Sequence, residues 1–167
     1  MEVSVAEVKA LREKTGAGVM ACRNALVEAE GDMDKAAEIL RQSGLAQAKK
    51  KASRVASQGL VETYVHAGGR IGAMVEVNCE TDFVARTDQF KELAHNLAMQ
   101  VAAIAPAYVS AEETPSDLEL DPKEACLLLQ PFIRDPDKSV QDIIDEVISK
   151  VGENIVVRRF ARFELGN

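Results

Sequence analysis

Apolar residues recur at helical spacing through the first 44 residues, in three separate stretches. The stripes are Val5, Val8 and Leu11; Cys22, Ala25, Leu26 and Ala29; and Met33, Ala36, Ala37 and Leu40. Ser4 with Glu7 is typical of a capping box, Asp32 can cap the third helix, and Gly44 is expected to end it. The pattern predicts a three-helix module over residues 1–44. Because so small a bundle buries few large side chains, we expect it to dock on another protein.

Residues 45–58 (LAQAKKKASRVASQ) are rich in Ala, Lys and Ser and predict a helical linker. Lys49, Lys50 and Lys51 have two interpretations. They could contact phosphate groups, but a solvated helix face is the more common outcome for such a run of charge.

From Gly59 the pattern changes to the alternation of a β-hairpin. Val61, Thr63 and Val65 alternate with Glu62, Tyr64 and His66, and Ile71, Ala73, Val75 and Val77 alternate beyond them. Gly68 and Gly69 between the two runs are a turn signal. We therefore expect an antiparallel hairpin with one buried face.

Two further apolar stripes predict long helices, and a last apolar run predicts a strand. The stripes are Phe90, Leu93, Leu97, Val101 and Ile104, within residues 88–104, and Val140, Ile143, Ile144, Val147 and Val151, ended by Gly152. Residues 110–122 are acidic and predict a surface loop, and an apolar stretch, 127–132, follows. In the strand at 155–165, strict alternation places Arg158, Arg162 and Glu164 on one face with Val156 and Phe160, so neither face is fully apolar.

Residues 59–167 are thus predicted to form an α+β core of about three antiparallel strands packed with two long helices. A three-stranded sheet leaves two edges that can pair with another chain. We therefore expect homodimerisation through this core.

The charge is unevenly divided along the 167 residues. Residues 1–58 hold 10 Lys and Arg against 8 Asp and Glu, whereas residues 59–167 hold 10 against 19. Nucleic-acid binding requires a basic surface to neutralise phosphates, so the acidic main body argues against a nucleic acid as the direct partner.

The chain has three widely spaced cysteines, Cys22, Cys79 and Cys126, in no metal-binding pattern. An odd number without such spacing argues against a disulfide framework or a zinc site, and indicates a reducing, cytoplasmic setting. We expect no membrane span, since no apolar run is long enough to cross a bilayer. We also expect no secretory signal, since the N-terminus has no apolar stretch of the kind that signal peptides contain.

Candidates for catalysis are few, and we expect no enzyme and no cofactor. His66 and His95 have no Ser or Cys at a spacing typical of a nucleophile pair. The Gly16–Gly18 segment lacks the third glycine of a dinucleotide fingerprint. Glu76, Glu80 and Asp82 could hold a metal, although a solvated acidic rim is the more common explanation.

The segment from Asn78 to Arg86 (NCETDFVAR) lies where a strand meets a helix, and it has two interpretations. In the first, Thr81 and Asp82 are turn and cap residues while Phe83 and Val84 enter the core. In the second, Phe83 projects outward as an interaction anchor whose direction Asp82 fixes. Because an apolar residue in a loop is ordinarily buried, the residues alone favour the first interpretation.

Three segments resemble the signatures of the bacterial elongation factor Ts family. These are Leu11–Met20 (LREKTGAGVM), Glu76–Ala85 (EVNCETDFVA) and Gly152–Phe160 (GENIVVRRF). Together they extend the resemblance over nearly the whole chain, in the family's order.

The resemblance implies a guanine-nucleotide exchange factor for the GTPase elongation factor Tu, with a ubiquitin-associated-like module at residues 1–44. The Thr81, Asp82, Phe83 and Val84 motif would displace the magnesium ion from the partner's nucleotide site, with Phe83 as a wedge. Further partner contacts are expected at Arg12, Met20, Arg23, Asn78 and Gln100. The single, short core implies pairing of two chains.

The chain departs from the family pattern at three places. Ala21 stands where Asp is usual, Gln100 stands where many relatives have His, and the segment between Ser110 and Gln130 is short. Two other functions compete with exchange: an adaptor that binds proteins without exchange activity, and a nucleic-acid-binding module that uses residues 49–54. The Thr81–Val84 motif favours exchange, because an adaptor does not need a presented Phe.

Overall fold

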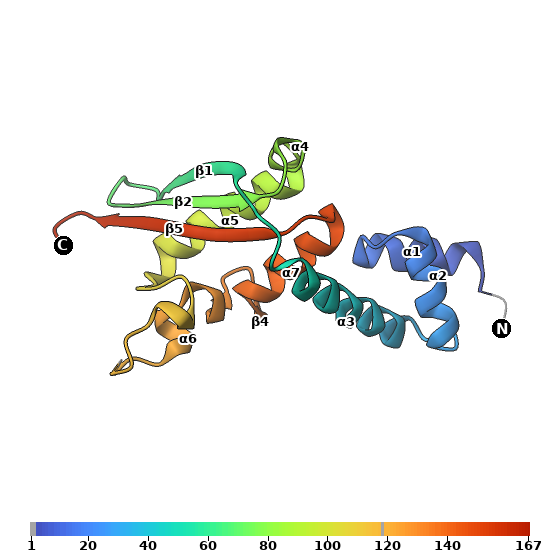
Figure 1. The fold of residues 1–167 in the computed structure, drawn as a ribbon. Helices are drawn as coiled ribbons and strands as arrows, with labels where there is room; N and C mark the ends of the chain where they lie inside the picture. Colours follow the sequence, from blue (N-terminus) through green and yellow to red (C-terminus); the bar gives the residue numbers. More distant parts are fainter. Residues whose placement is uncertain (1–2, 118) are drawn as a thin grey trace.

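A computed structural model of the chain describes residues 3–117 and 119–167, and it has the predicted α+β architecture. The N-terminal helices and the core lie side by side, with α1 and α2 at one end of the molecule and the C-terminus at the other (Figure 1). The first helices are α1 (Val5–Thr15), α2 (Val19–Glu28) and α3 (Met33–Lys51). The core comprises β1 (Gln58–Val65), β2 (Ile71–Cys79), α4 (Asp82–Ala85), α5 (Asp88–Ile104), η1 (Ala111–Glu113), α6 (Pro122–Ala125), η2 (Leu127–Leu129), β3 (Pro131–Phe132), β4 (Asp135–Ser139), α7 (Val140–Val151) and β5 (Ile155–Glu164).

Helices α1 and α3 begin at the predicted caps, and the predicted stripes pack together in the module. The prediction for Val5 is wrong, because this first residue of α1 is 86% exposed. Ser4 and Glu7 form a reciprocal capping box on α1, and the Asp32 side chain accepts from the amides at the start of α3. The small core of the module contains Val8, Leu11, Cys22, Ala25, Leu26, Ala29 and Ala36. These contacts satisfy the end amides and give the short helices a common apolar centre.

The prediction that Gly44 ends the third helix is wrong, because α3 continues to Lys51. Gly44 is buried inside this helix and faces α7, where a side chain would meet Ser149. A glycine in a helix allows such close approach of a neighbouring helix. Consequently α3 includes the first half of the predicted linker, residues 45–51, and packs along α7 of the core.

The three-stranded sheet has the order β1-β2-β5, with both pairs antiparallel. The predicted hairpin turn is present, since His66 and Gly69 close it with backbone hydrogen bonds. In Figure 1, α5 passes behind the strands. It packs on the face that carries Ala73, Val75 and Val77, which together with Phe90, Leu97 and Ile144 form the centre of the core.

The expected strict alternation in the last strand is wrong, because β5 contains a bulge. Glu76 pairs with Arg159 whereas the next residue, Val77, pairs with Val157, which leaves Arg158 as an extra residue. An extra residue reverses the side-chain alternation beyond it. Ile155 and Val157 therefore share the helix-covered face with residues 160, 162 and 164, and one face of the sheet is mainly apolar after all.

A second, two-stranded sheet was not predicted: β3 and β4 pair within residues 131–139, between the acidic loop and α7. The described residues of the acidic loop include the short turn η1 and the start of α6, and Leu118 lies outside the described residues. Over the described ranges, 3–117 and 119–167, no helix combines the length and apolar character needed to cross a membrane.

Candidate partner-binding site

Phe83 lies on the surface, on the single turn of helix α4 that follows β2. Its side chain is 77% exposed, whereas its neighbours Val84 and Ala85 are buried against the core. Figure 1 shows α4 projecting at one end of the sheet. Of the two interpretations, the geometry therefore agrees with the one in which the Phe83 side chain points into solvent. The Val84 side chain is buried and packs the turn against the core. A large aromatic held in water by a well-packed base is the usual form of a binding anchor.

Thr81 caps this turn and is hydrogen-bonded through every polar group it has. Its Oγ1 accepts from the Val84 amide at 3.5 Å and donates to Glu153 at 2.6 Å. Its amide donates to the same carboxylate at 2.9 Å, and its carbonyl accepts from the Cys79 thiol at 3.1 Å. The residue that begins α4 is thus fixed on both sides of its own backbone.

Asp82 occupies the first turn of α4 and forms an ion pair with Arg86, at 2.7 Å between Oδ2 and Nη2. A carboxylate at the start of a helix and a pair four residues apart both favour the helical turn. Because both side chains are exposed, the pair contributes little on its own. Asp82 is therefore placed to support the turn that carries Phe83.

Cys79 stabilises the loop as a neutral thiol. Burial, together with the negative charge of Glu153, raises the pKa of Cys79 to about 11. The protonated thiol remains available at neutral pH to donate to the Thr81 carbonyl.

The other carboxylates near the loop are each paired with a positive or donor group. Glu76 accepts from Arg159 at 2.7 Å, and this hydrogen bond lowers the pKa of the Glu76 carboxyl. Glu80 accepts from the Asn154 amide at 2.7 Å and lies 3.6 Å from Arg54. Among the residues that the structure describes, no group of His, Cys, Asp and Glu side chains has an arrangement that could hold a metal ion.

Two of the residues expected to contact a partner are buried. Asn78 donates its side-chain amide to the Gln58 carbonyl, which joins the ends of β1 and β2. Gln100 is 0% exposed and its amide bonds to Gln130, to the Pro131 carbonyl and to the Ile133 amide. Gln100 thus holds the β3–β4 hairpin against α5, and this geometry gives no support to a direct partner contact.

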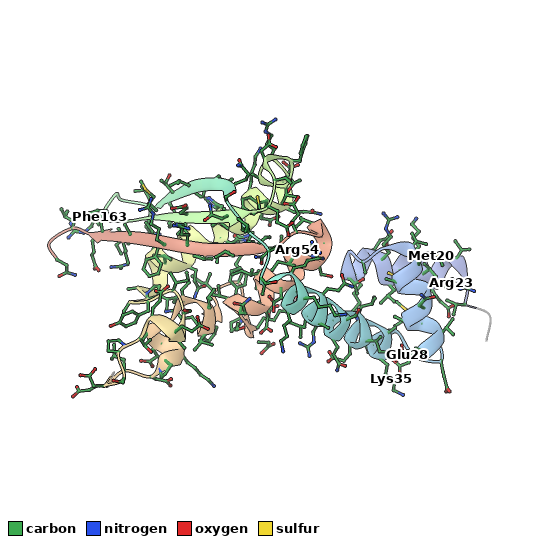
Figure 2. The ribbon with its side chains drawn as sticks, viewed as in Figure 1. Met20, Arg23, Glu28, Lys35, Arg54 and Phe163 are labelled. Atoms are coloured by element: carbon green, nitrogen blue, oxygen red, sulfur yellow. The ribbon has the colours of Figure 1, made fainter. Side chains whose placement is uncertain are left out.

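The three expected contact residues of the module are exposed. Arg12 lies on α1, and Met20 and Arg23 lie on α2. Figure 2 shows Met20 and Arg23 at the end of the molecule that the N-terminal helices form. Met20 is 63% exposed, and Val19 and Val27 of the same helix are also solvent-accessible. An exposed apolar strip beside a basic residue is a suitable surface for docking on a protein.

The two histidines lie together but form no nucleophile pair. Both contact Tyr64, whose hydroxyl lies 3.1 Å from His66 Nδ1 and whose ring meets that of His95 edge-on.

Two residues that contact the loop were not predicted from the sequence. They are Glu153 and Asn154, which lie more than 70 positions away from the loop along the chain. The one available signal was their place in the third signature segment.

Comparison with known proteins gives a consistent result. The sequence profile of the family described as elongation factor TS matches residues 33–123. The chain is 52% identical to elongation factor Ts of Moorella thermoacetica, over 98% of this chain and 96% of that protein. It is 52% identical to elongation factor Ts of Carboxydothermus hydrogenoformans, over 95% and 87% of the two chains, and 50% identical to that of Caldanaerobacter subterraneus, over 98% and 97%. The chain therefore belongs to the elongation factor Ts family.

Proposed function

We propose that this chain is the guanine-nucleotide exchange factor of elongation factor Tu, and that it promotes GDP release by displacing the partner's magnesium ion. The observation that carries the proposal is the exposed Phe83 on a rigidly capped turn, within the Thr81–Val84 motif. Membership of a translation elongation factor family supports the partner.

The mechanism requires no bond-breaking group on this chain. An exchange protein that binds the nucleotide-free partner more tightly weakens the partner's affinity for nucleotide. By thermodynamic linkage, bound nucleotide weakens the partner's affinity for the exchange protein by the same ratio. In the partner, magnesium bridges the phosphates and is the largest local charge. Phe83 acts as the wedge that shifts the element supporting this ion, and the new interface supplies the free energy.

The geometry of the motif supports a separate role for each of its residues. Phe83 supplies the desolvated anchor, Thr81 and Asp82 hold the turn that carries it, and Val84 fixes the turn to the core. The module supplies a second contact through Arg12, Met20 and Arg23, so that the partner is held at two places on one chain.

We also propose that two copies of the chain pair through the face of the sheet opposite α5. This open sheet face is defined by Val61, Val65, Met74, Ala161 and Phe163. One row places Thr63, Met74 and Ala161 side by side, and the row at the hairpin end places Val65, Gly72 and Phe163 beside them. On the other side of Thr63, Val61 lies beside the ion-paired Glu76 and Arg159. An apolar surface spread over three strands is costly to leave in water, and a second copy presents the same surface in return.

The experiment is the release of fluorescent GDP from purified elongation factor Tu, with and without this chain, at several magnesium concentrations. We expect strong acceleration at millimolar magnesium and a much smaller effect after magnesium is chelated, because the ion's contribution is then already lost. Binding without acceleration would favour a simple adaptor and would overturn the proposal. Equal acceleration with and without magnesium would retain exchange and exclude magnesium displacement.

A further inference from the structure

We infer that Glu153 is a positioning residue for nucleotide exchange, because it sets the direction of Phe83 by fixing Thr81. The inference rests on the proposed function and adds a residue that lies outside the Thr81–Val84 motif. Glu153 follows α7, 70 residues beyond Phe83 in the sequence, and is partly buried beside the loop.

The Glu153 carboxylate accepts three hydrogen bonds from the start of the loop. One oxygen accepts the amides of Glu80 and Thr81, at 3.1 and 2.9 Å, and the other accepts the Thr81 hydroxyl at 2.6 Å. Hydrogen bonds to an ionised acceptor are roughly twice as strong as neutral ones. The carboxylate thus binds two consecutive residues immediately before α4.

The contact is reciprocal, and it holds the segment after α7 (residues 153–154) against the segment before α4 (residues 80–81). Glu80 returns the interaction, since its carboxylate accepts the Asn154 amide at 2.7 Å. The Asn154 side chain then donates to the Arg54 carbonyl at 2.8 Å, in the segment between α3 and β1. Arg54 lies at the centre of the molecule in Figure 2, between the module and the sheet. Residues 153 and 154 therefore join three segments of the chain.

This arrangement matters because α4 is too short to hold itself. A helix of four residues has too few internal hydrogen bonds to offset the cost of nucleation. Its geometry is therefore imposed by the residue that caps it, and that residue is Thr81. Release of Thr81 would let the turn rotate or fray, and the exposed Phe83 two residues later would lose its fixed direction. A wedge that must be ordered at each encounter binds less effectively than one already in place.

The first test reads the loop itself and does not depend on activity. In Glu153→Ala, we expect the amides of Glu80 and Thr81 to exchange hydrogen about tenfold faster or more, as follows from losing a hydrogen bond to a charged group. Amides of Val75 and Val77 within β2 should keep their wild-type rates. In Glu153→Gln, which can still accept a hydrogen bond, protection should be largely retained.

The second test measures GDP release from elongation factor Tu at saturating factor. We expect Glu153→Ala to lower the maximal rate about tenfold, and Glu153→Gln to recover most of it. In a Phe83→Ala background, adding Glu153→Ala should change the rate less than about twofold, because both changes remove the same wedge. The matched control is Glu146→Ala, which also removes one carboxylate, because Glu146 lies on α7 and pairs with Lys138 instead of the loop.

The outcomes separate this inference from the proposed function. Unchanged protection of Glu80 and Thr81, or a wild-type rate in Glu153→Ala, overturns the inference and leaves the exchange function intact. A fold-loss in the double variant equal to the product of the two single fold-losses also overturns it, since Glu153 would then act independently of Phe83. If the wild-type chain itself accelerates nothing, the proposed function fails and the inference fails with it.

Discussion

Gly44 of α3 and Ser149 of α7 lie so close together that a methyl group on Gly44 would be 3.1 Å from the Ser149 hydroxyl. This contact brings the long helix of the module against the last helix of the core. Because Gly44 has no side chain, α3 packs against α7 at this point.

Gly44→Leu should therefore destabilise the chain by about 1–3 kcal/mol, because the added side chain forces α3 away from α7. The free energy of unfolding from urea denaturation is the measurement. Ala46→Leu, on an exposed position of the same helix, should change it by no more than about 0.5 kcal/mol. Ser149→Gly in the Gly44→Leu background should restore part of the loss, and a loss that Ser149→Gly leaves untouched would contradict the contact.

Gln100→Ala should lower stability by about 1–3 kcal/mol, because the Ile133 amide and the Gln130 side chain lose a buried partner. The measurement is chemical denaturation, with Gln47→Ala at an exposed position as the control. GDP release per folded molecule should remain at the wild-type level. A stable Gln100→Ala variant that had lost exchange activity would show that Gln100 acts on the partner and not on the β3–β4 hairpin.

Phe163→Asp should prevent the proposed pairing of two chains. Phe163 is 75% exposed at one end of the open sheet face (Figure 2), and a charge there would be buried without a partner on association. Sedimentation at micromolar concentration should show a dimer for the wild type and a monomer for the variant. Val5→Asp, at an exposed position of α1, should remain dimeric. A monomeric wild type would contradict the pairing directly.

Local patterns in the sequence were sufficient to place several elements correctly. The stripe from Phe90 to Ile104 predicted α5 well, because a long amphipathic helix repeats its signal over many turns. The Ser4–Glu7 box and the Asp32 cap were also predicted, since capping depends on residues two or three positions apart.

Features that depend on distant residues could not be read in the same way. Gly44 is a helix end by local rules and a close contact only once Ser149 is opposite it. The bulge at Arg158 depends on the register against β2, which alternation alone does not reveal. The loop site was predicted by its motif, but its support by Glu153 joins positions 72 residues apart.

The most direct test of the central claim compares Phe83→Ala with the wild type in the release of fluorescent GDP from elongation factor Tu. Because Phe83 is exposed, the variant should unfold at nearly the wild-type temperature, while the acceleration falls about tenfold or more. Leu120→Ala, an exposed apolar position in the acidic loop, should retain full activity. If Phe83→Ala is folded and accelerates GDP release as well as the wild type does, Phe83 is not the wedge and the account is contradicted.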